Sequence, residues 1–141
     1  MVRKVRMGEE LPLELARCAV ELFEVAGRDP RPVEMARHVR GPQLIAGMDG
    51  RAWGIWVAPP GARPVAPEWV RVEADEAIVI EAGTWHHGPI PEGGRGRFLT
   101  VEAPGTNVED FEVGVGNPRD RNSTRLNSRH TVISYAVFCL K

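Results

Sequence analysis

Short segments with strand composition, each ended by glycine or proline, run through most of this chain and constrain its fold more than any other feature. Clear examples are PQLIAGM and RAWGIWVA, VRVEADEAIVIEAG, and GRFLTVEAP after the glycine-rich EGGRG. This regular spacing of turns, without a convincing helix, predicts an all-β fold, a small antiparallel sandwich or barrel. Asp49-Gly50 separates the first two segments. Because Asp-Gly between apolar strands is a strong hairpin signal, residues 42–48 and 51–58 are expected to form a hairpin.

The N-terminal part of the pattern is ambiguous. RCAVELFEVAG (residues 17–27) alternates apolar and polar side chains as a strand does, whereas ELPLELARCAVELF (residues 10–23) also fits an amphipathic helix. The following GRDPRPVEMARH (residues 27–38) contains two prolines, and residues before proline favour extended backbone. We expect it to be an extended connector.

The last 22 residues, DRNSTRLNSRHTVISYAVFCLK, resemble the conceptual translation of a sequencing-library adapter. The match is DRxSTRLNSxH, then two free residues, Thr131 and Val132, then ISYAVFCL. We therefore expect residues 1–119 to form one domain, truncated at its C-terminus, and residues 120–141 to be no native segment. Such a tail would be loose or would dock as an edge strand. The alternative is a genuine C-terminal strand, because TVISYAVF has strand composition.

Composition without this tail excludes several classes of partner. The tail carries four of the chain's 18 basic side chains and one of its 19 acidic ones, so the remaining residues have a net charge of about −4. No basic face is expected for nucleic acid. Cys18 is then the single cysteine, which excludes an intramolecular disulfide and favours a reducing compartment. Without a membrane-length apolar run or a signal core, the sequence predicts a cytoplasmic protein with no membrane partner.

IEAGTWHHGP, residues 80–89, is the stretch with the clearest chemical potential. Adjacent histidines on a strand point to opposite faces, so at most one of His86 and His87 can point inward. Gly83 allows the chain to turn, and alternation places His86 on one face with Thr84. His86 is therefore the candidate, and His87 is expected to be structural or at the rim.

Two cupin motifs can be aligned with the chain. The second motif places Gly83 and His86 on its closing glycine and histidine, with Asp75 and Glu81 replacing its opening glycine and its proline. The first motif falls on Ala36, His38, Gln43 and Gly50, of which His38 and Gly50 match. The chain thus resembles the cupins at these positions.

A closer resemblance is to the ureidoglycolate lyases. ARHVRGPQLIAG (residues 36–47), TWHHGP (residues 84–89) and RFLTVEAPGTNVED (residues 97–110) are similar to the segments of that family, in the same order. The similarity runs from Val20 to Val113. It implies a single small cupin-like β-barrel, an antiparallel sandwich or jelly roll. It also implies an enzyme of allantoin and purine breakdown that cleaves ureidoglycolate to glyoxylate and urea.

That reaction implies roles for four residues. A base must take the hydroxyl proton as the C–N bond opens, and an acid must protonate the departing nitrogen; histidine can serve either role. His86 and His38 are the proton-transfer candidates. Arg37 is expected to hold the substrate carboxylate through its forked donors, and Gln43 to orient the substrate.

A divalent metal is the second implication of the resemblance. His38, Gln43 and His86, with Glu81 as a further candidate, would bind nickel, zinc, iron or manganese, since these ligand types do not select among them. However, Ala36 stands where the family has glutamate, and Glu81 stands where it usually has histidine. A metal-free acid–base site is therefore the rival hypothesis.

Two other functions stay open at this stage. The departures at Ala36 and Glu81 favour either a cupin of another metal-dependent activity, an isomerase or dioxygenase, or a non-catalytic cupin that binds a small molecule. The expected partner is a small ureido or hydroxy-acid substrate, and no nucleic acid partner is expected. A homodimer is expected, because small cupin barrels commonly pair and the four tryptophans could supply an interface.

Overall fold

The computed structural model describes residues 1–10, 17–106, 110–115 and 130–140, the last of these for the backbone only. Its strands are β1 (Val2–Arg6), β2 (Arg17–Ala26), β3 (Glu34–Arg37), β4 (Gln43–Gly47), β5 (Trp53–Ala58), β6 (Glu68–Val72), β7 (Glu76–Ile80), β8 (Trp85–His86), β9 (Ile90–Pro91), β10 (Arg95–Glu102), β11 (Glu112–Val115) and β12 (His130–Leu140). Within these ranges no helix has both the length and the apolar character needed to cross a membrane. The predicted all-β fold is confirmed.

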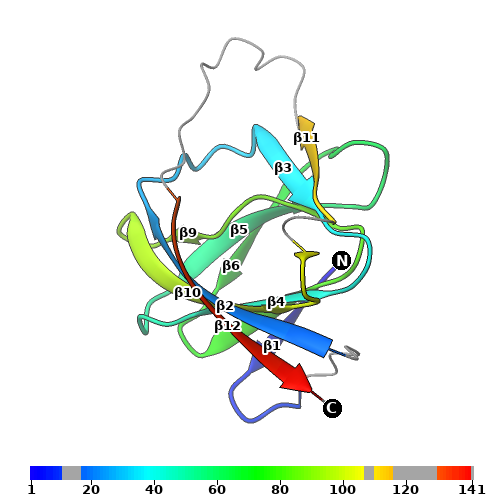
Figure 1. The fold of residues 1–141 in the computed structure, drawn as a ribbon. Coiled ribbons are helices and arrows are strands. Elements are labelled where there is room, and N and C mark those ends of the chain that lie inside the picture. The colour runs from blue at the N-terminus through cyan, green and yellow to red at the C-terminus, as the bar shows by residue number, and fades with distance from the viewer. Residues whose placement is uncertain (11–16, 107–109, 116–129, 141) are drawn as a thin grey trace.

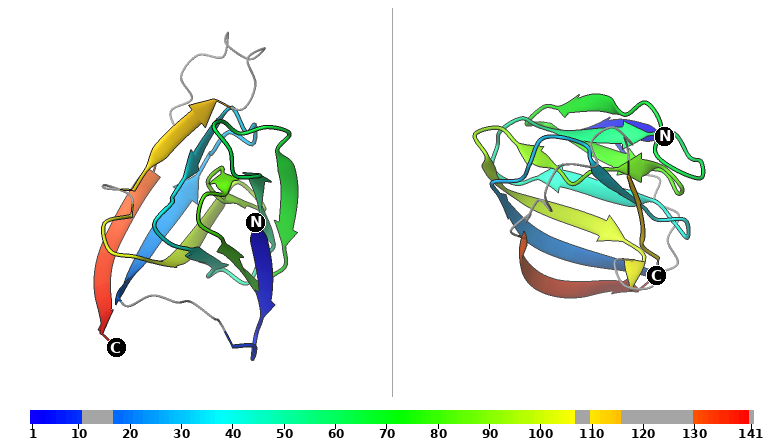
Figure 2. Two further views of the ribbon diagram at one scale, coloured as in Figure 1. Left: turned by 90° about the vertical axis from the view of Figure 1, so that its right-hand side faces the viewer. Right: turned by 90° about the horizontal axis from the view of Figure 1, so that it is seen from above.

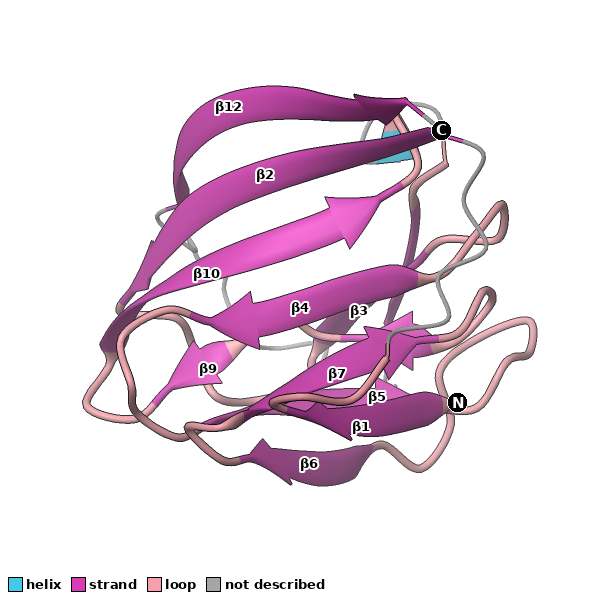
Figure 3. Ribbon diagram, turned by 90° about the horizontal axis from the view of Figure 1, so that it is seen from below, coloured by secondary structure: helices cyan, strands magenta, loops and turns pink. Residues whose placement is uncertain are grey.

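The strands form two antiparallel sheets that face each other. The first sheet has the order β1-β7-β4-β10-β2-β12, which can be followed across Figure 3. The second sheet has the order β11-β3-β8-β5-β6, with β9 paired to β5 (Figure 1). Figure 2 shows β1 and β12, the two edges of the first sheet, on opposite sides of the molecule. The architecture is that of a cupin-like β-sandwich.

Apolar side chains from both sheets meet between them. Phe98 of β10 stacks on Phe23 of β2 at 5.6 Å between ring centroids and meets the edge of Trp53 of β5 at 5.2 Å. The buried members of this central cluster are Phe23, Val25, Ile45, Trp53, Ile55, Val57, Val72, Ile78, Ile80 and Phe98. Because these residues mark the inner faces, alternation along each strand identifies which neighbours also point inward.

The hairpin predicted across Asp49-Gly50 is wrong. β4 lies in the first sheet between β7 and β10, whereas β5 lies in the second sheet between β8 and β6. Gly50 does provide the left-handed turn, with φ of 66°, but the turn carries the chain from one sheet to the other. The Asp49 carboxylate accepts hydrogen bonds from the Arg97 backbone N–H at 2.6 Å and side-chain Nε at 2.9 Å, which ties the crossing to β10. Local turn chemistry specified the reversal but not the strand partners.

The two N-terminal segments whose structure was ambiguous or expected to be irregular both contain strands. Residues 17–26 are a strand, β2, while residues 11–16 of the alternative helix lie outside the described residues. The expected connector contains a strand as well, because Glu34–Arg37 forms β3 between β11 and β8. Met35 explains this, since its side chain is buried in a cluster with Ala58 and Trp85.

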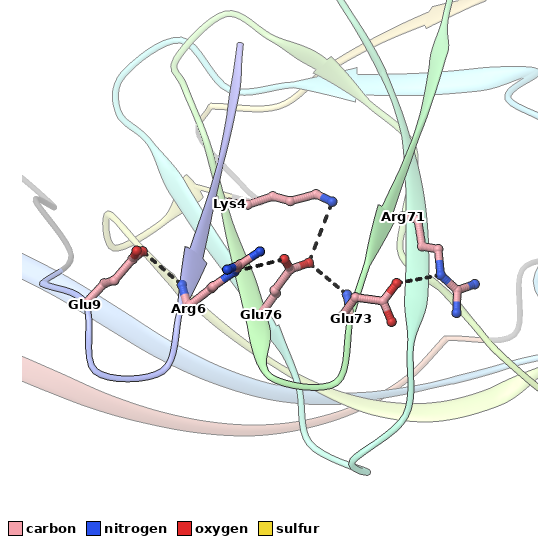
Figure 4. Close-up of polar contacts among 6 residues, drawn as sticks. All are labelled: Lys4, Arg6, Glu9, Arg71, Glu73 and Glu76. Carbon is pink, nitrogen blue, oxygen red and sulfur yellow. Dashed lines mark hydrogen bonds and ion pairs between the residues drawn. The ribbon is translucent and has the colours of Figure 1, made fainter.

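A charged network surrounds the turn from β6 to β7 (Figure 4). The Glu76 carboxylate accepts a hydrogen bond from the Glu73 backbone N–H at 3.0 Å and lies 3.6 Å from both Lys4 Nζ and Arg6 Nε. Glu73 in turn pairs with Arg71 at 2.8 Å. The Glu73 N–H bond, with Lys4 and Arg6 helping and burial opposing, lowers the pKa of Glu76. The turn is thus linked to the edge strand β1.

The C-terminal segment adds one edge strand. The backbone of β12 pairs with β2 from His130↔Val25 to Leu140↔Arg17, with an irregularity between Ile133 and Val137. Residues 120–129 and 141 lie outside the described residues. An edge position is one of the two arrangements expected for a non-native tail, and a genuine terminal strand would occupy it equally well.

Candidate active site

Two buried histidines from different strands meet between the sheets. His38 directly follows β3 and is 5% exposed, and His86 lies in β8 and is 7% exposed. Their ring centroids are 5.1 Å apart. His86 is the register partner of Val57 on one side and of Ala36 on the other. Because directly opposed residues share a face and Val57 belongs to the central core, His86 points inward.

The sequence positions His86 through the turn before β8. Gly83 has φ of 85°, a conformation that favours glycine, and its N–H donates to the His38 carbonyl at 2.7 Å. This hydrogen bond holds the two histidine-bearing segments together. The next residue, His87, is only half-buried, and its backbone N–H donates to the Trp56 carbonyl. The prediction that only one histidine of the adjacent pair points inward is consistent with this geometry.

Main-chain carbonyls orient both rings. His38 Nδ1 donates to the Asp110 carbonyl at 2.6 Å, and His86 Nδ1 donates to the Thr84 carbonyl at 3.2 Å. A carbonyl can only accept, so Nδ1 carries the proton in each ring and Nε2 is the remaining nitrogen. Neither Nε2 atom has a hydrogen bond among those recorded for the described residues. Each ring therefore keeps one nitrogen for proton exchange.

Asp110 supports His38 from outside the pair. Its carboxylate accepts hydrogen bonds from the backbone N–H groups of Val39 at 2.9 Å and Arg40 at 2.7 Å. Burial tends to raise the pKa of Asp110, but these two N–H donors and the charge of His38 lower it overall. The Asp110 carboxylate therefore holds the backbone of Val39 and Arg40 next to the His38 ring.

His86 lies in a different electrostatic environment. Burial, followed by the charge of His38, lowers the pKa of His86 to about 4. The imidazole is therefore neutral at pH 7, and its Nε2 lone pair can accept a proton.

The first sheet contributes a polar wall to the same interior, formed by Gln43, Thr100 and Glu102. Gln43 shares the inner face of β4 with the core residue Ile45, and Thr100 and Glu102 share that of β10 with Phe98. Gln43 Nε2 donates to Glu102 Oε2 at 2.6 Å. Glu102 is 3% exposed, and burial, opposed by this hydrogen bond, raises its pKa to about 7.

Glu102 and Thr100 were missed by the sequence analysis. The signal that could have identified them is the alternation in RGRFLTVE, which puts Gly96, Phe98, Thr100 and Glu102 on one face. A carboxylate in the position expected for a core residue requires a specific partner, because burying an unpaired charge is costly.

The histidine pair and the polar wall lie at the same end of the sandwich. One short crossing, residues 39–42, joins His38 to Gln43 at the start of β4. A second, residues 81–84, joins the end of β7 to β8, and the last residue of β7 is the register partner of Gln43. Both crossings are short, and the Gly83 N–H in the second donates to the carbonyl of His38, which directly precedes the first. The histidines and Gln43 therefore lie at the same end of the sandwich.

Arg37 and Glu81 are not brought to this cluster. Arg37 lies over the Trp85 ring at 4.5 Å and pairs with Glu112 at 2.7 Å, on the side of β3 opposite to His38. Glu81 is 68% exposed and pairs with the N-terminal ammonium group at 3.0 Å. The expectations that Arg37 anchors a substrate at the histidines and that Glu81 supplies a metal ligand find no support in this geometry. Alternation explains Arg37, since consecutive strand residues point to opposite faces.

Of the expected metal ligands, His38 and His86 are the two whose side chains are shown to meet within the described residues. Among its His, Cys, Asp and Glu side chains, no group of three or more lies in an arrangement that could hold a metal ion. The register places the methyl group of Ala36, rather than a carboxylate, opposite His86. No third His, Cys, Asp or Glu side chain of the described residues completes a site with the two imidazoles, so the reaction proposed for this chain uses no metal.

Comparison with known proteins identifies relatives of this chain. A family model described as ureidoglycolate lyase matches residues 7–117. A ureidoglycolate lyase of Rhizobium etli strain CIAT 652 is 32% identical over 103 residues, which cover 70% of this chain and 62% of that protein. A ureidoglycolate lyase of Rhizobium etli strain CFN 42 is 31% identical over a match of the same extent. The matched region thus spans less than two thirds of the length of either relative.

The two shifted groups make the stability of the fold depend on pH in opposite directions. The folded-state pKa of His86 lies below its ordinary value of 6.5, so its contribution is complete above pH 6.5 and is lost as pH falls toward 4. The folded-state pKa of Glu102 lies above its ordinary 4.5, so its contribution is complete below pH 4.5 and is lost as pH rises through 7. Each shift corresponds to about 3 kcal/mol.

Urea denaturation between pH 4 and 8 measures these contributions. His86→Asn is expected to remove the loss of unfolding free energy on the acid side, and Glu102→Gln to remove the loss on the neutral side. The exposed Glu68→Gln serves as a control and should leave the pH dependence unchanged. Variants with the same pH dependence as the original chain would show that neither group is titrating in the interior.

Ala36 offers a direct test of the incomplete ligand set. Because Ala36 is the register partner of His86, Ala36→Glu should place a carboxylate within reach of the histidine pair. This variant is expected to bind Ni²⁺ at least tenfold more tightly than the original chain, as measured by isothermal titration calorimetry. Val39→Glu, at an exposed position next to His38, is the control. Equal Ni²⁺ affinity of both variants and the original chain would contradict the geometry.

Proposed function

Because this chain belongs to the ureidoglycolate lyase family, we propose that it cleaves ureidoglycolate to glyoxylate and urea with His38 and His86 as its proton-transfer groups. The observation that supports the proposal most strongly is the buried histidine pair, 5.1 Å apart, with Nδ1 of each ring held by a main-chain carbonyl. This arrangement leaves two imidazole nitrogens available in one enclosed environment.

The reaction moves one proton from oxygen to nitrogen. His86, neutral at pH 7, accepts the hydroxyl proton of ureidoglycolate at Nε2 while the C–N bond opens and the C=O bond of glyoxylate forms. His38, acting as the acid in its protonated form, donates a proton from Nε2 to the departing urea nitrogen. The pair then returns to its starting state when a proton passes from His86 to His38, so atoms and charges balance without a co-reactant.

A second candidate function rests on Ala36. The resemblance of residues 36–47 to the family implies glutamate at this position, and the alanine opposite His86 leaves the pair without that carboxylate. This favours a small-molecule-binding protein that has lost catalysis, with the same interior retained for a ureido or hydroxy-acid ligand. Turnover decides between the two.

The decisive experiment incubates the protein with racemic ureidoglycolate and measures released urea and glyoxylate. Equimolar products from one enantiomer are expected. His86→Asn and His38→Asn should each lower kcat by about 10²- to 10⁴-fold, the usual contribution of general acid–base catalysis. His87→Asn, a change of the same type next to the pair, should change kcat by less than threefold. No release of urea, or equal rates in all three variants, would refute the proposed reaction.

We also propose a cellular setting and an assembly for this domain. A chain that cleaves ureidoglycolate would act in allantoin breakdown, and its single cysteine within residues 1–119 suits the cytoplasm. Residues 1–119 would be the working domain, since the family match ends at residue 117. Trp69, 44% exposed, packs edge-on against Trp56 on the outer side of β5 and β6, and such exposed aromatic pairs are typical of interfaces. We therefore propose a homodimer that forms through this face.

Light scattering coupled to size-exclusion chromatography tests the proposed working domain and the proposed homodimer. The full chain and a chain ending at Arg119 are each expected to have the mass of a dimer, because the proposed interface lies on the second sheet, away from β12. Trp69→Lys should give a monomer, whereas Lys4→Ala at the edge of the first sheet should remain dimeric. A shortened chain that fails to fold would show that residues 120–141 belong to the domain.

A further inference from the structure

We propose that Gln43, Thr100 and Glu102, the polar wall of the first sheet, form a subsite that recognises the ureido group by its terminal amine and its carbonyl. The proposal rests on the proposed function, because it places the two ends of one substrate against the two sides of the interior. Sequence patterns had singled out only Gln43 of these three residues.

Two buried polar atoms of this wall lack hydrogen-bond partners within the described part of the chain. Gln43 Oε1 and Thr100 Oγ1 are buried and have no hydrogen-bond partner among the contacts of the described residues. Both side chains are more than nine-tenths buried. A buried polar atom without a partner destabilises the fold, so its retention on an inner face indicates a ligand that satisfies it.

The hydrogen bond between Gln43 and Glu102 fixes which atoms of the wall can accept from a ligand. Gln43 Nε2 donates to Glu102 Oε2 at 2.6 Å, which orients the amide and leaves its oxygen as an acceptor. In its ionised form the Glu102 carboxylate beside it can accept from more than one donor, because a carboxylate has about four lone-pair sites. Acceptors grouped in this way suit a ligand group with several N–H donors, and a terminal ureido amine has two.

Thr100 completes the match. Its register partners are Ile45 of β4 and Glu21 of β2, so its hydroxyl lies on the inner face one row from Gln43 and Glu102. A hydroxyl donates as well as accepts, and can therefore bond the ureido carbonyl while the two other residues bond the amine. The carbon that bears the substrate hydroxyl would then extend toward His38 and His86, at the same end of the sandwich.

Two non-cleavable ligands separate this subsite from the reaction. N-carbamoylglycine carries the ureido group but no hydroxyl, so it cannot undergo the cleavage. N-acetylglycine has nearly the same shape, with a methyl group in place of the terminal amine. The ratio of their dissociation constants, measured by calorimetry with the full chain, reports recognition of the amine alone. The original chain is expected to bind N-carbamoylglycine at least tenfold more tightly.

Substitutions assign the recognition to individual residues. Glu102→Gln presents donors to the amine and should bring the ratio close to one. Thr100→Val removes the hydroxyl and should weaken both ligands by about fivefold, without changing the ratio, since both carry the carbonyl. Val101→Thr makes the reverse change on the outer face of the same strand and should alter neither constant. Thermal unfolding should show all three variants folded, and Thr100→Val at least as stable as the original chain, because its hydroxyl has no partner to lose.

Equal affinity of the original chain for the two ligands would overturn the inference, as would a ratio that Glu102→Gln leaves unchanged. Tighter binding of guanidinoacetate than of N-carbamoylglycine would also overturn it, since the wall would then be a cation site. These results are independent of catalysis. Turnover of ureidoglycolate with a ratio of one would refute the subsite alone, whereas a tenfold ratio without turnover would refute the lyase activity and leave a ureido-binding protein.

Discussion

Burying two imidazoles side by side requires an acceptor for each ring N–H, and the rest of this interior depends on how the fold meets that requirement. The carbonyls of Asp110 and Thr84 accept from His38 and His86. Both carbonyls belong to residues that lie just before a strand, Asp110 before β11 and Thr84 before β8, where backbone groups are not used by a sheet ladder. The same hydrogen bonds fix the tautomer of each ring. They satisfy the buried Nδ1–H donors and leave Nε2 for proton transfer.

The polar end of the interior is supported by an apolar one. Phe23, Phe98 and Trp53 pack between the sheets and hold the strands that carry the polar wall and the histidines. Glu102 lies four residues after Phe98 in β10 and therefore on the same face of the strand. A rigid apolar layer thus sets the position of groups whose own burial is unfavourable, and a shifted pKa is the measurable sign of that cost.

Some candidate residues could be placed from their sequence neighbours alone, whereas others could not. His86 and Gly83 could be predicted, because a glycine-containing turn followed by alternation is local. His38 and Gln43 were suggested by resemblance, and the structure places both in the interior. Arg37 was assigned to the same side as its neighbour His38, although alternation along β3 places them on opposite sides. Arg37 was placed beside His38 because the two are adjacent in the motif, without regard to the direction of side chains along a strand.

The sequence by itself indicated an all-β chain, a turn at Asp49-Gly50 and an inward-pointing His86, since these follow from residue type and a period of two. Only the tertiary structure decided that β4 and β5, on either side of Asp49-Gly50, belong to different sheets, and that Glu102 reaches Gln43 across 59 positions of sequence. Strand pairing is a competition among all available edges. Its outcome depends on total burial between the sheets, which no local segment encodes.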